Sequence, residues 1–136
     1  MRPYHDTSAL PAHHARFTVL DFETTGSVRG WPVEPWQIGL VGIAGGRLLA
    51  DGYDSLLRID PGRPFNPHAP GRHARLRTAL ATAPSLADLW PFLAENWLLG
   101  RVLVAHNVGT ERSVLRRAAP LHRPGPWIDT LRLVRR

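Results

Sequence analysis

Two carboxylates, Asp21 and Glu23, are separated by a single aromatic residue, Phe22. Residues i and i+2 of a strand share one face, so the two side chains are expected to lie together, roughly 7 Å apart along the chain. Neighbouring anions repel each other unless a cation lies between them. Mg²⁺ or Mn²⁺, which prefer oxygen ligands, would be the natural partner. The alternative is a solvent-exposed strand end with no ligand.

The residues on either side of this pair favour a site over a plain surface. Residues 17–20 are apolar or β-branched, which predicts a buried strand over residues 17–21. Thr24, Thr25 and Gly26 then break the strand and allow the backbone to approach a ligand closely. We therefore interpret Asp21 and Glu23 as projecting into a cleft, while Phe22 points into the core.

Two sequence strings resemble motifs of one enzyme family. Residues 21–26, D-F-E-T-T-G, resemble the first motif of the DEDD-type (DEDDh) 3′–5′ exonucleases, which include the epsilon proofreading subunit of bacterial DNA polymerase III and RNase T. In the family's second motif, His-Asn follows a strand and an acidic residue lies on the next helix. His106, Asn107 and Glu111 are similar to it, although most members have Asp where this chain has Glu111.

The resemblance implies a metal-dependent hydrolase with two Mg²⁺ or Mn²⁺ ions about 4 Å apart. Asp21 would bridge both ions, Glu23 would hold the ion on the side of the attacking water, and Glu111 would hold the second. These three are the expected catalytic and metal-binding residues. The residues expected to contact the substrate are Thr24, Thr25, Gly26, His106 and Asn107. Of these, we expect His106 to support the site rather than act as a general base.

Other matches leave alternatives open. Taken alone, Glu111 would be a helix-end charge stabilised by the helix dipole. Asp129 lies in a D-T-L string that the family also has, and we interpret it as the N-cap of a helix starting at Thr130 rather than as a metal ligand. Residues 73–84 match the length of a family segment that begins H-G-I, but Ala74 and Arg75 replace its second and third residues.

The third family motif, H-x-x-x-x-D, supplies the general base and a fourth carboxylate, and residues 1–136 do not contain it. We therefore predict an exonuclease-like domain over residues 17–136 that is incomplete at its C-terminus and poorly active alone, preceded by a flexible tail over residues 1–16. The alternative is a degenerate nucleic-acid-binding or interaction module of the same fold. A ribonuclease-H-like nuclease of another branch fits less well, because such enzymes lack the H-N-x-x-x-[DE] string.

Composition sets broader limits. The 136 residues suit one soluble domain, with 43% hydrophobic and 21% charged residues. The absence of cysteine excludes disulfides, a thiolate zinc site and a cysteine nucleophile. No apolar run approaches the ~20 residues of a membrane span, and the N-terminus lacks the apolar core of a secretory signal. We expect a cytoplasmic protein without a membrane partner.

All 17 residues counted as Lys or Arg are arginines, and the net charge is +6. Such a charge balance favours polyanionic partners, although a GC-rich genome, which tends to encode Arg, Ala, Pro and Gly, would produce it too. The expected partner is nucleic acid with a free 3′ end, single-stranded, with a DNA polymerase or a longer host polypeptide as a further partner.

The order of elements predicts an α/β protein with a ribonuclease-H-like fold, in which helices flank a mixed sheet. Strands are expected at residues 36–44 and 47–59, joined by a turn at Gly45-Gly46, and at 101–105 and 127–128. A first helix is expected at residues 73–83. A second helix should begin at a capping box formed by Ser85 and Asp88. Two more are expected at about residues 109–119 and from residue 130 onward. Pro91 should kink the second helix or delay its start. A proline-rich loop is expected at residues 60–71.

Overall fold

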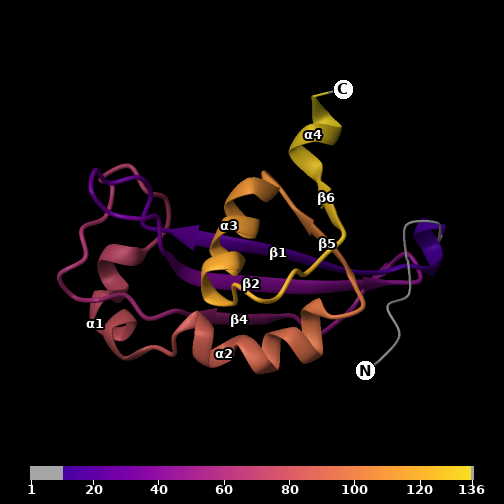
Figure 1. Cartoon of the computed structure of the whole chain (residues 1–136), viewed down its shortest axis with the longest axis horizontal. Coiled ribbons are helices and arrows are strands. Elements are labelled where there is room, and N and C mark those ends of the chain that lie inside the picture. The colour runs from indigo at the N-terminus through magenta and orange to yellow at the C-terminus, as the bar shows by residue number, and fades with distance from the viewer. Residues whose placement is uncertain (1–10, 136) are drawn as a thin grey trace.

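A six-stranded mixed sheet organises residues 11–135, the part of the chain that the computed structural model describes. Its strands are β1 (Arg16–Thr24), β2 (Pro35–Ala44), β3 (Arg47–Leu48), β4 (Tyr53–Leu56), β5 (Val102–Ala105) and β6 (Trp127–Asp129). Their order is β3-β2-β1-β5-β6, and β4 also pairs with β2 (Figure 1). β2 runs antiparallel to β1, whereas β5 runs parallel to both β1 and β6. The predicted mixed sheet and ribonuclease-H-like fold class are confirmed.

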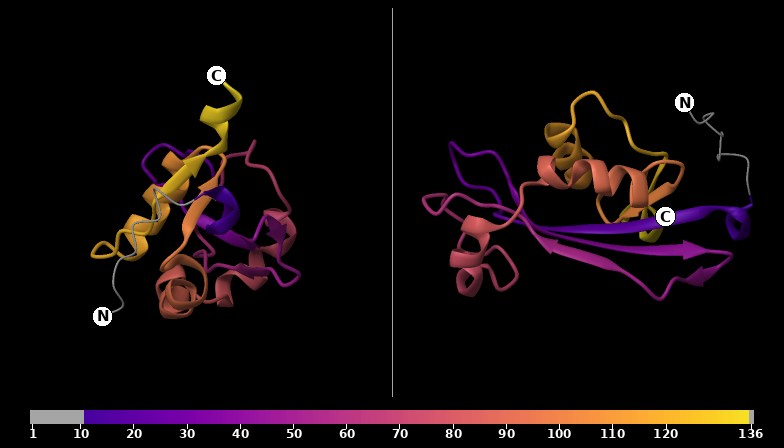
Figure 2. Two further views of the ribbon diagram at one scale, coloured as in Figure 1. Left: turned by 90° about the vertical axis from the view of Figure 1, so that its right-hand side faces the viewer. Right: turned by 90° about the horizontal axis from the view of Figure 1, so that it is seen from below.

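The helices follow the predicted order along the chain. They are α1 (His73–Thr82), α2 (Leu86–Leu93), α3 (Val108–Ala118) and α4 (Thr130–Val134), with a 3₁₀ turn at Ala12–His14 and a π-helical segment at Ala94–Leu98. α2 and α3 cover the same face of the sheet (Figure 2). Within residues 11–135, no helix is long and apolar enough to cross a membrane.

Strand β1 alternates strictly between the two faces of the sheet. Thr18, Leu20 and Phe22 are buried on the face that α2 and α3 cover. Asp21 is exposed and Glu23 is half-buried, because the pleat turns them to the opposite face. The main core therefore fixes β1 through its even-numbered residues and leaves its carboxylates on the uncovered side.

The second half of the predicted hairpin is interrupted. Instead of one strand over residues 47–59, β3 and β4 both pair with β2, and residues 49–52 lie between them. Leu49 N still donates to Gly42 O at 2.8 Å, so the backbone bulges without leaving β2. Glycine at position 52 lets this bulge lie close to β2, because a Cβ there would lie 3.0 Å from the Leu40 carbonyl oxygen.

A short turn leads into β1. Residues 1–10 lie outside the described part of the chain. Residues 12–14 form the 3₁₀ turn, in which His14 N donates to Pro11 O at 2.9 Å. β1 begins at Arg16, because this residue already pairs with Ala44 of β2. A 3₁₀ turn therefore precedes the first strand, and the flexible tail over residues 1–16 stays a prediction.

The predicted capping box of α2 is present, and Pro91 lies inside the helix. Ser85 Oγ accepts from Asp88 N at 3.0 Å, while the Asp88 carboxylate accepts from Ser85 N at 3.2 Å. Pro91 has no N–H to give to the preceding turn, which weakens the α-helical bonding around it. The chain continues into the π-helical segment, where Trp97 O accepts from Thr18 Oγ1 at 2.5 Å. This bond attaches the irregular segment to β1.

Candidate metal and nucleic-acid site

The carboxyl-terminal half of β1 is open along one edge. β5 pairs with β1 only from Phe17 to Val19, so the edge beside Asp21 has no partner strand. On its other side Asp21 pairs with Gly39 of β2, and Gly39 pairs in turn with Asp54 of β4. Asp21, Gly39 and Asp54 therefore form a row across three strands. Its central residue is a glycine, so no side chain separates the two carboxylates.

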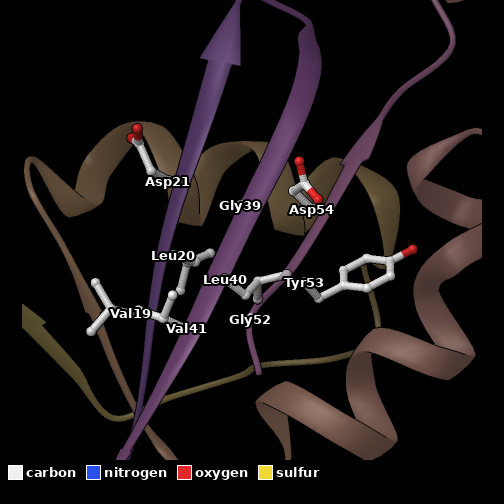
Figure 3. A pocket seen from close by; sticks show the side chains of 9 residues that line it. All are labelled: Val19, Leu20, Asp21, Gly39, Leu40, Val41, Gly52, Tyr53 and Asp54. Atoms are coloured by element: carbon white, nitrogen blue, oxygen red, sulfur yellow. The ribbon is translucent and has the colours of Figure 1, made fainter. Parts of the chain in front are cut away.

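Figure 3 shows that row at the end of a shallow pocket of about 400 Å³. Asp21 and Asp54 project on either side of Gly39, above an apolar floor that includes Val19 and Val41. A Cβ added to Gly39 would meet no atom within 4 Å, so the space between the two carboxylates is open. Sequence reasoning did not find Asp54, because no local pattern marks it as a neighbour of β1.

Glu111 reaches the same region from the first turn of α3. Only 3% of this residue is exposed, and its Oε2 is buried with no hydrogen-bond partner among the described residues. Burial raises the pKa of Glu111, and the charge of Asp21 raises it further, although the amides of Glu111 and Phe22 oppose the shift. Glu111 is thus a nearly buried acid with an unpartnered oxygen, close enough to Asp21 to feel its charge.

Glu23 is the third predicted ligand. Partial burial raises the pKa of Glu23, and the neighbouring Asp21 adds to the effect. Asp21, Glu23 and Glu111 offer only carboxylate oxygens, the donors that Mg²⁺ and Mn²⁺ prefer. Within residues 11–135, however, no three Asp, Glu or His side chains are grouped closely enough to hold a metal ion. The donor chemistry and the unpartnered Oε2 fit a divalent cation, but the predicted ligand set is not preassembled.

The turn after Glu23 is built on a glycine that no other residue could replace easily. Gly26 has φ +69°, and a Cβ there would lie 2.8 Å from the Cβ of Asn66. Its N–H donates to Thr24 Oγ1 at 3.2 Å. Asn66 N in turn donates to Thr25 O at 2.8 Å. The turn and the proline-rich loop are therefore in direct contact, which fixes the path of the backbone beyond β1.

Thr25 is fully buried, and its polar groups are already used. Its hydroxyl accepts from Glu34 N and from Arg63 Nη2, both at 3.1 Å, and donates to Gly26 O. Its backbone N–H donates to Glu34 O at 2.9 Å. Thr25 thus has the contacts of a residue that positions the turn, and the substrate contacts expected of Thr24, Thr25 and Gly26 stay predictions.

Arg63, which no sequence pattern singles out, is buried and hydrogen-bonds to several segments around the turn after β1. It is 1% exposed, and its guanidinium donates to Thr25 Oγ1 and to Glu34 Oε2 at 2.6 Å. It also donates to the carbonyls of Pro32 (2.5 Å) and Pro64. Nothing in the proline-rich segment distinguishes Arg63 from the other arginines, because its partners other than Pro64 lie 29 to 38 residues away.

Asp129 has two roles at the ends of neighbouring elements. As predicted, it caps α4, accepting from Leu131 N at 3.0 Å. It also accepts from Asn107 N at 3.0 Å and Val108 N at 3.3 Å, where α3 begins. Burial tends to raise the pKa of Asp129, but these backbone N–H groups hold it below its ordinary value. Asp129 thereby fixes the start of the helix that carries Glu111.

The His-Asn pair lies at the same junction. Asn107 has φ +71° and immediately precedes α3, so its left-handed backbone turns the chain from β5 into the helix. His106 is exposed, and its Nδ1 lies 3.0 Å from Thr130 Oγ1. This hydrogen bond links the second sequence string to the D-T-L segment. Substrate contacts by His106 and Asn107 stay predictions.

The chain is an α/β protein in which helices flank a mixed sheet. Two carboxylates, Asp21 and Glu23, lie near the C-terminal end of its central strand, β1. No family model matches the sequence, and no curated protein sequence matches it. Solved structures do match, and the resemblance covers most of this chain.

Three of them are forms of exonuclease I. An apo form has a TM-score of 0.69 at 12% identity over 90% of this chain. A zinc-bound complex of the Escherichia coli enzyme with single-stranded DNA has a TM-score of 0.70 at 12% identity over 90% of this chain. The enzyme from Methylocaldum szegediense has a TM-score of 0.68 at 14% identity over 89% of this chain. The chain spans 30%, 29% and 29% of these three proteins. At such identities the similarity shows the exonuclease I-like fold; a specific likeness to the epsilon subunit or RNase T stays a prediction.

Proposed function

We propose that the chain is a metal-dependent 3′–5′ exonuclease domain, or the part of one that contains its first two motifs. The observation that supports this most directly is the approach of three carboxylates from two elements of an exonuclease I-like fold. Asp21 and Glu23 lie on the uncovered face of β1, and Glu111 approaches its open edge from α3. The proposed substrate is the 3′ end of a single DNA or RNA strand.

Within this proposal, Asp21 and Glu23 would hold divalent ions from the strand, and Glu111 would hold them from the helix. Such ions lower the pKa of an attacking water and stabilise the leaving oxygen. Asp129 positions Glu111 by fixing the start of α3, and Arg63 positions the turn that would receive the terminal nucleotide. A DNA polymerase or longer host polypeptide as partner, and a cytoplasmic location, also remain proposals.

The second candidate function is a nucleic-acid-binding module of the same fold without catalysis. It is favoured by the lack of a preassembled three-carboxylate group in residues 11–135. It predicts binding that depends on salt but is unaffected by Mg²⁺ or by Asp21→Asn.

Single strands labelled at either the 3′ or the 5′ end distinguish these functions. With Mg²⁺ or Mn²⁺ we expect slow release of mononucleotides from the 3′ label first, because the carboxylates would be present without the family's general base. Asp21→Asn should abolish the release, whereas Asp54→Asn, which removes the other carboxylate beside Gly39, should not. Release that survives Asp21→Asn, or that begins at the 5′ end, would contradict the proposed exonuclease. Strand binding that ignores both Mg²⁺ and Asp21→Asn, without release, would support the second candidate.

A further inference from the structure

A second pocket, of about 470 Å³, lies where α3 and the loop that connects it to β6 meet. Figure 1 shows this loop passing from the end of α3 back to the edge strand β6. The pocket is lined by α3, which packs on the sheet face of Leu20 and Phe22, whereas Asp21 and Glu23 face the other side by the alternation of β1. Its lining is basic: Arg112, Arg116, His122 and Arg123, with Pro124, Gly125, Pro126 and Trp127. No Asp or Glu belongs to that lining.

The three arginines of this basic pocket form no ion pair with any residue in the range 11–135. Arg112, Arg116 and Arg123 are exposed, and the one ion pair within residues 11–135 joins Arg63 to Glu34 instead. Like charges gathered around one concavity raise the free energy of the protein unless an anion enters. The charge distribution therefore favours a ligand with more than one negative group.

The shape of the basic pocket is held from several directions. Arg112 and Arg116 are four residues apart on α3, so they lie side by side, with Cβ atoms about 5–6 Å apart. The Arg112 guanidinium lies 6.0 Å from the centre of the Trp127 ring, and Trp127 Nε1 donates to Pro124 O at 3.0 Å. The His122 ring packs against Trp90 of α2, with ring centres 5.5 Å apart. Two prolines stiffen the loop opposite the helix.

We propose that this basic pocket binds the phosphodiester backbone of a single nucleic-acid strand, at nucleotides upstream of the 3′ end. The inference rests on the proposed function. Arginine side chains form a fork of donors that matches phosphate oxygens, and side-by-side arginines match successive phosphates along a strand. Trp127 adds a planar surface, as in other sites that bind single strands through arginine and aromatic side chains.

The position of the basic pocket suits an upstream contact. Glu111 and Arg112 are adjacent residues near the start of α3, but Glu111 is buried toward β1 while Arg112 is exposed toward the pocket. A strand whose 3′ end lies at the carboxylates reaches the pocket by passing around this turn. Short strands would end before it, so the contribution of the pocket to binding should depend on strand length.

The test compares Arg116→Gln/Arg123→Gln with Arg16→Gln/Arg47→Gln. The control pair removes the same charge from exposed arginines at the opposite end of β1, where Arg16 pairs with Ala44 and Ala44 with Arg47. For a fluorescent 20-nucleotide oligothymidylate at low salt we expect the pocket variant to bind about tenfold more weakly. The slope of log affinity against log salt should fall by about 1.4, for two lost phosphate contacts.

A four-nucleotide strand should bind both variants and the wild type equally. Equal loss in the two variants, or equal loss for short and long strands, would overturn the proposal. So would a polyglutamate peptide that binds the pocket in an Arg116- and Arg123-dependent way while the long strand does not. The proposed nuclease activity is tested separately, because Asp21→Asn should abolish nucleotide release and leave the length-dependent binding unchanged.

Discussion

Gly71→Ala is expected to lower the free energy of unfolding by about 3 kcal/mol or more. Gly71 has φ +97°, a conformation that costs other residues about 1–3 kcal/mol. A Cβ there would also lie 2.5 Å from Cζ2 and 3.0 Å from Cη2 of Trp36, a side chain that is 2% exposed. Forcing an extra carbon against a buried ring typically costs a further ~1–3 kcal/mol.

Gly30→Ala separates these two causes. Gly30 has φ +83°, but a Cβ there would meet nothing within 4 Å, so only backbone strain should appear, about 1 kcal/mol. Urea denaturation of both variants gives the comparison directly. If Gly71→Ala lowered the free energy of unfolding no more than Gly30→Ala, the close contact between Gly71 and the Trp36 ring would be contradicted. The position bears on the site as well, since a Cβ on Gly71 would lie 3.6 Å from Glu23 Oε2.

Arg63→Met is expected to lower the free energy of unfolding by at least about 3 kcal/mol. Hydrogen bonds made by a charged group contribute about 1.5–3 kcal/mol each, and this change removes the bonds that Arg63 donates to Thr25 Oγ1 and to the Pro32 carbonyl. Methionine keeps much of the aliphatic volume, so the loss would come mainly from these polar contacts. Urea denaturation measures the effect.

Glu34→Gln is the matched control for the ion pair. The Glu34 side chain is 40% exposed, and its charge should contribute no more than about 1 kcal/mol to stability. A large loss in Arg63→Met with a small one in Glu34→Gln would show that Arg63 acts through the turn rather than through the ion pair. Equal losses would contradict the role in positioning Thr25.

Local sequence was sufficient for the parts of the site that lie on one strand or one helix. The apolar approach and the period of two placed Asp21 and Glu23 on one face of β1, and β1 has that alternation. The capping box at Ser85 and the cap at Asp129 were predicted because their partners lie within three residues. Glu111 was assigned to the site only through its resemblance to a motif, since a helix-end carboxylate has no local mark of a ligand.

The remainder of the site depends on contacts between distant segments, which local patterns do not encode. Arg63 is buried because two loops close over it, and Gly71 is required because Trp36 packs on it. Asp54 lies near Asp21 only through the pairing of both strands with β2. The long predicted strand after Gly46 is broken because residues 49–52 bulge, and its hydrophobicity gave no sign of this.

The raised pKa values of Glu23 and Glu111 determine how folding stability changes with pH in the absence of metal. Both carboxyls bind protons more tightly in the folded state than in the unfolded state. Their neutral forms therefore favour folding below the ordinary pKa of 4.5, and this advantage is lost as pH rises through the raised values. A divalent cation would offset the loss, so its stabilising effect should grow over the same range of pH.

The most direct test of the carboxylate metal site is the thermal unfolding midpoint as a function of Mn²⁺ concentration. We predict a saturable rise at pH 7.5, equivalent to about 2.7 kcal/mol at 100 times the dissociation constant. Asp21→Asn should abolish the rise and Glu111→Gln should weaken it, whereas Asp54→Asn should leave it unchanged. An unfolding midpoint that Mn²⁺ does not raise, or that rises equally in Asp21→Asn and wild type, would contradict the site.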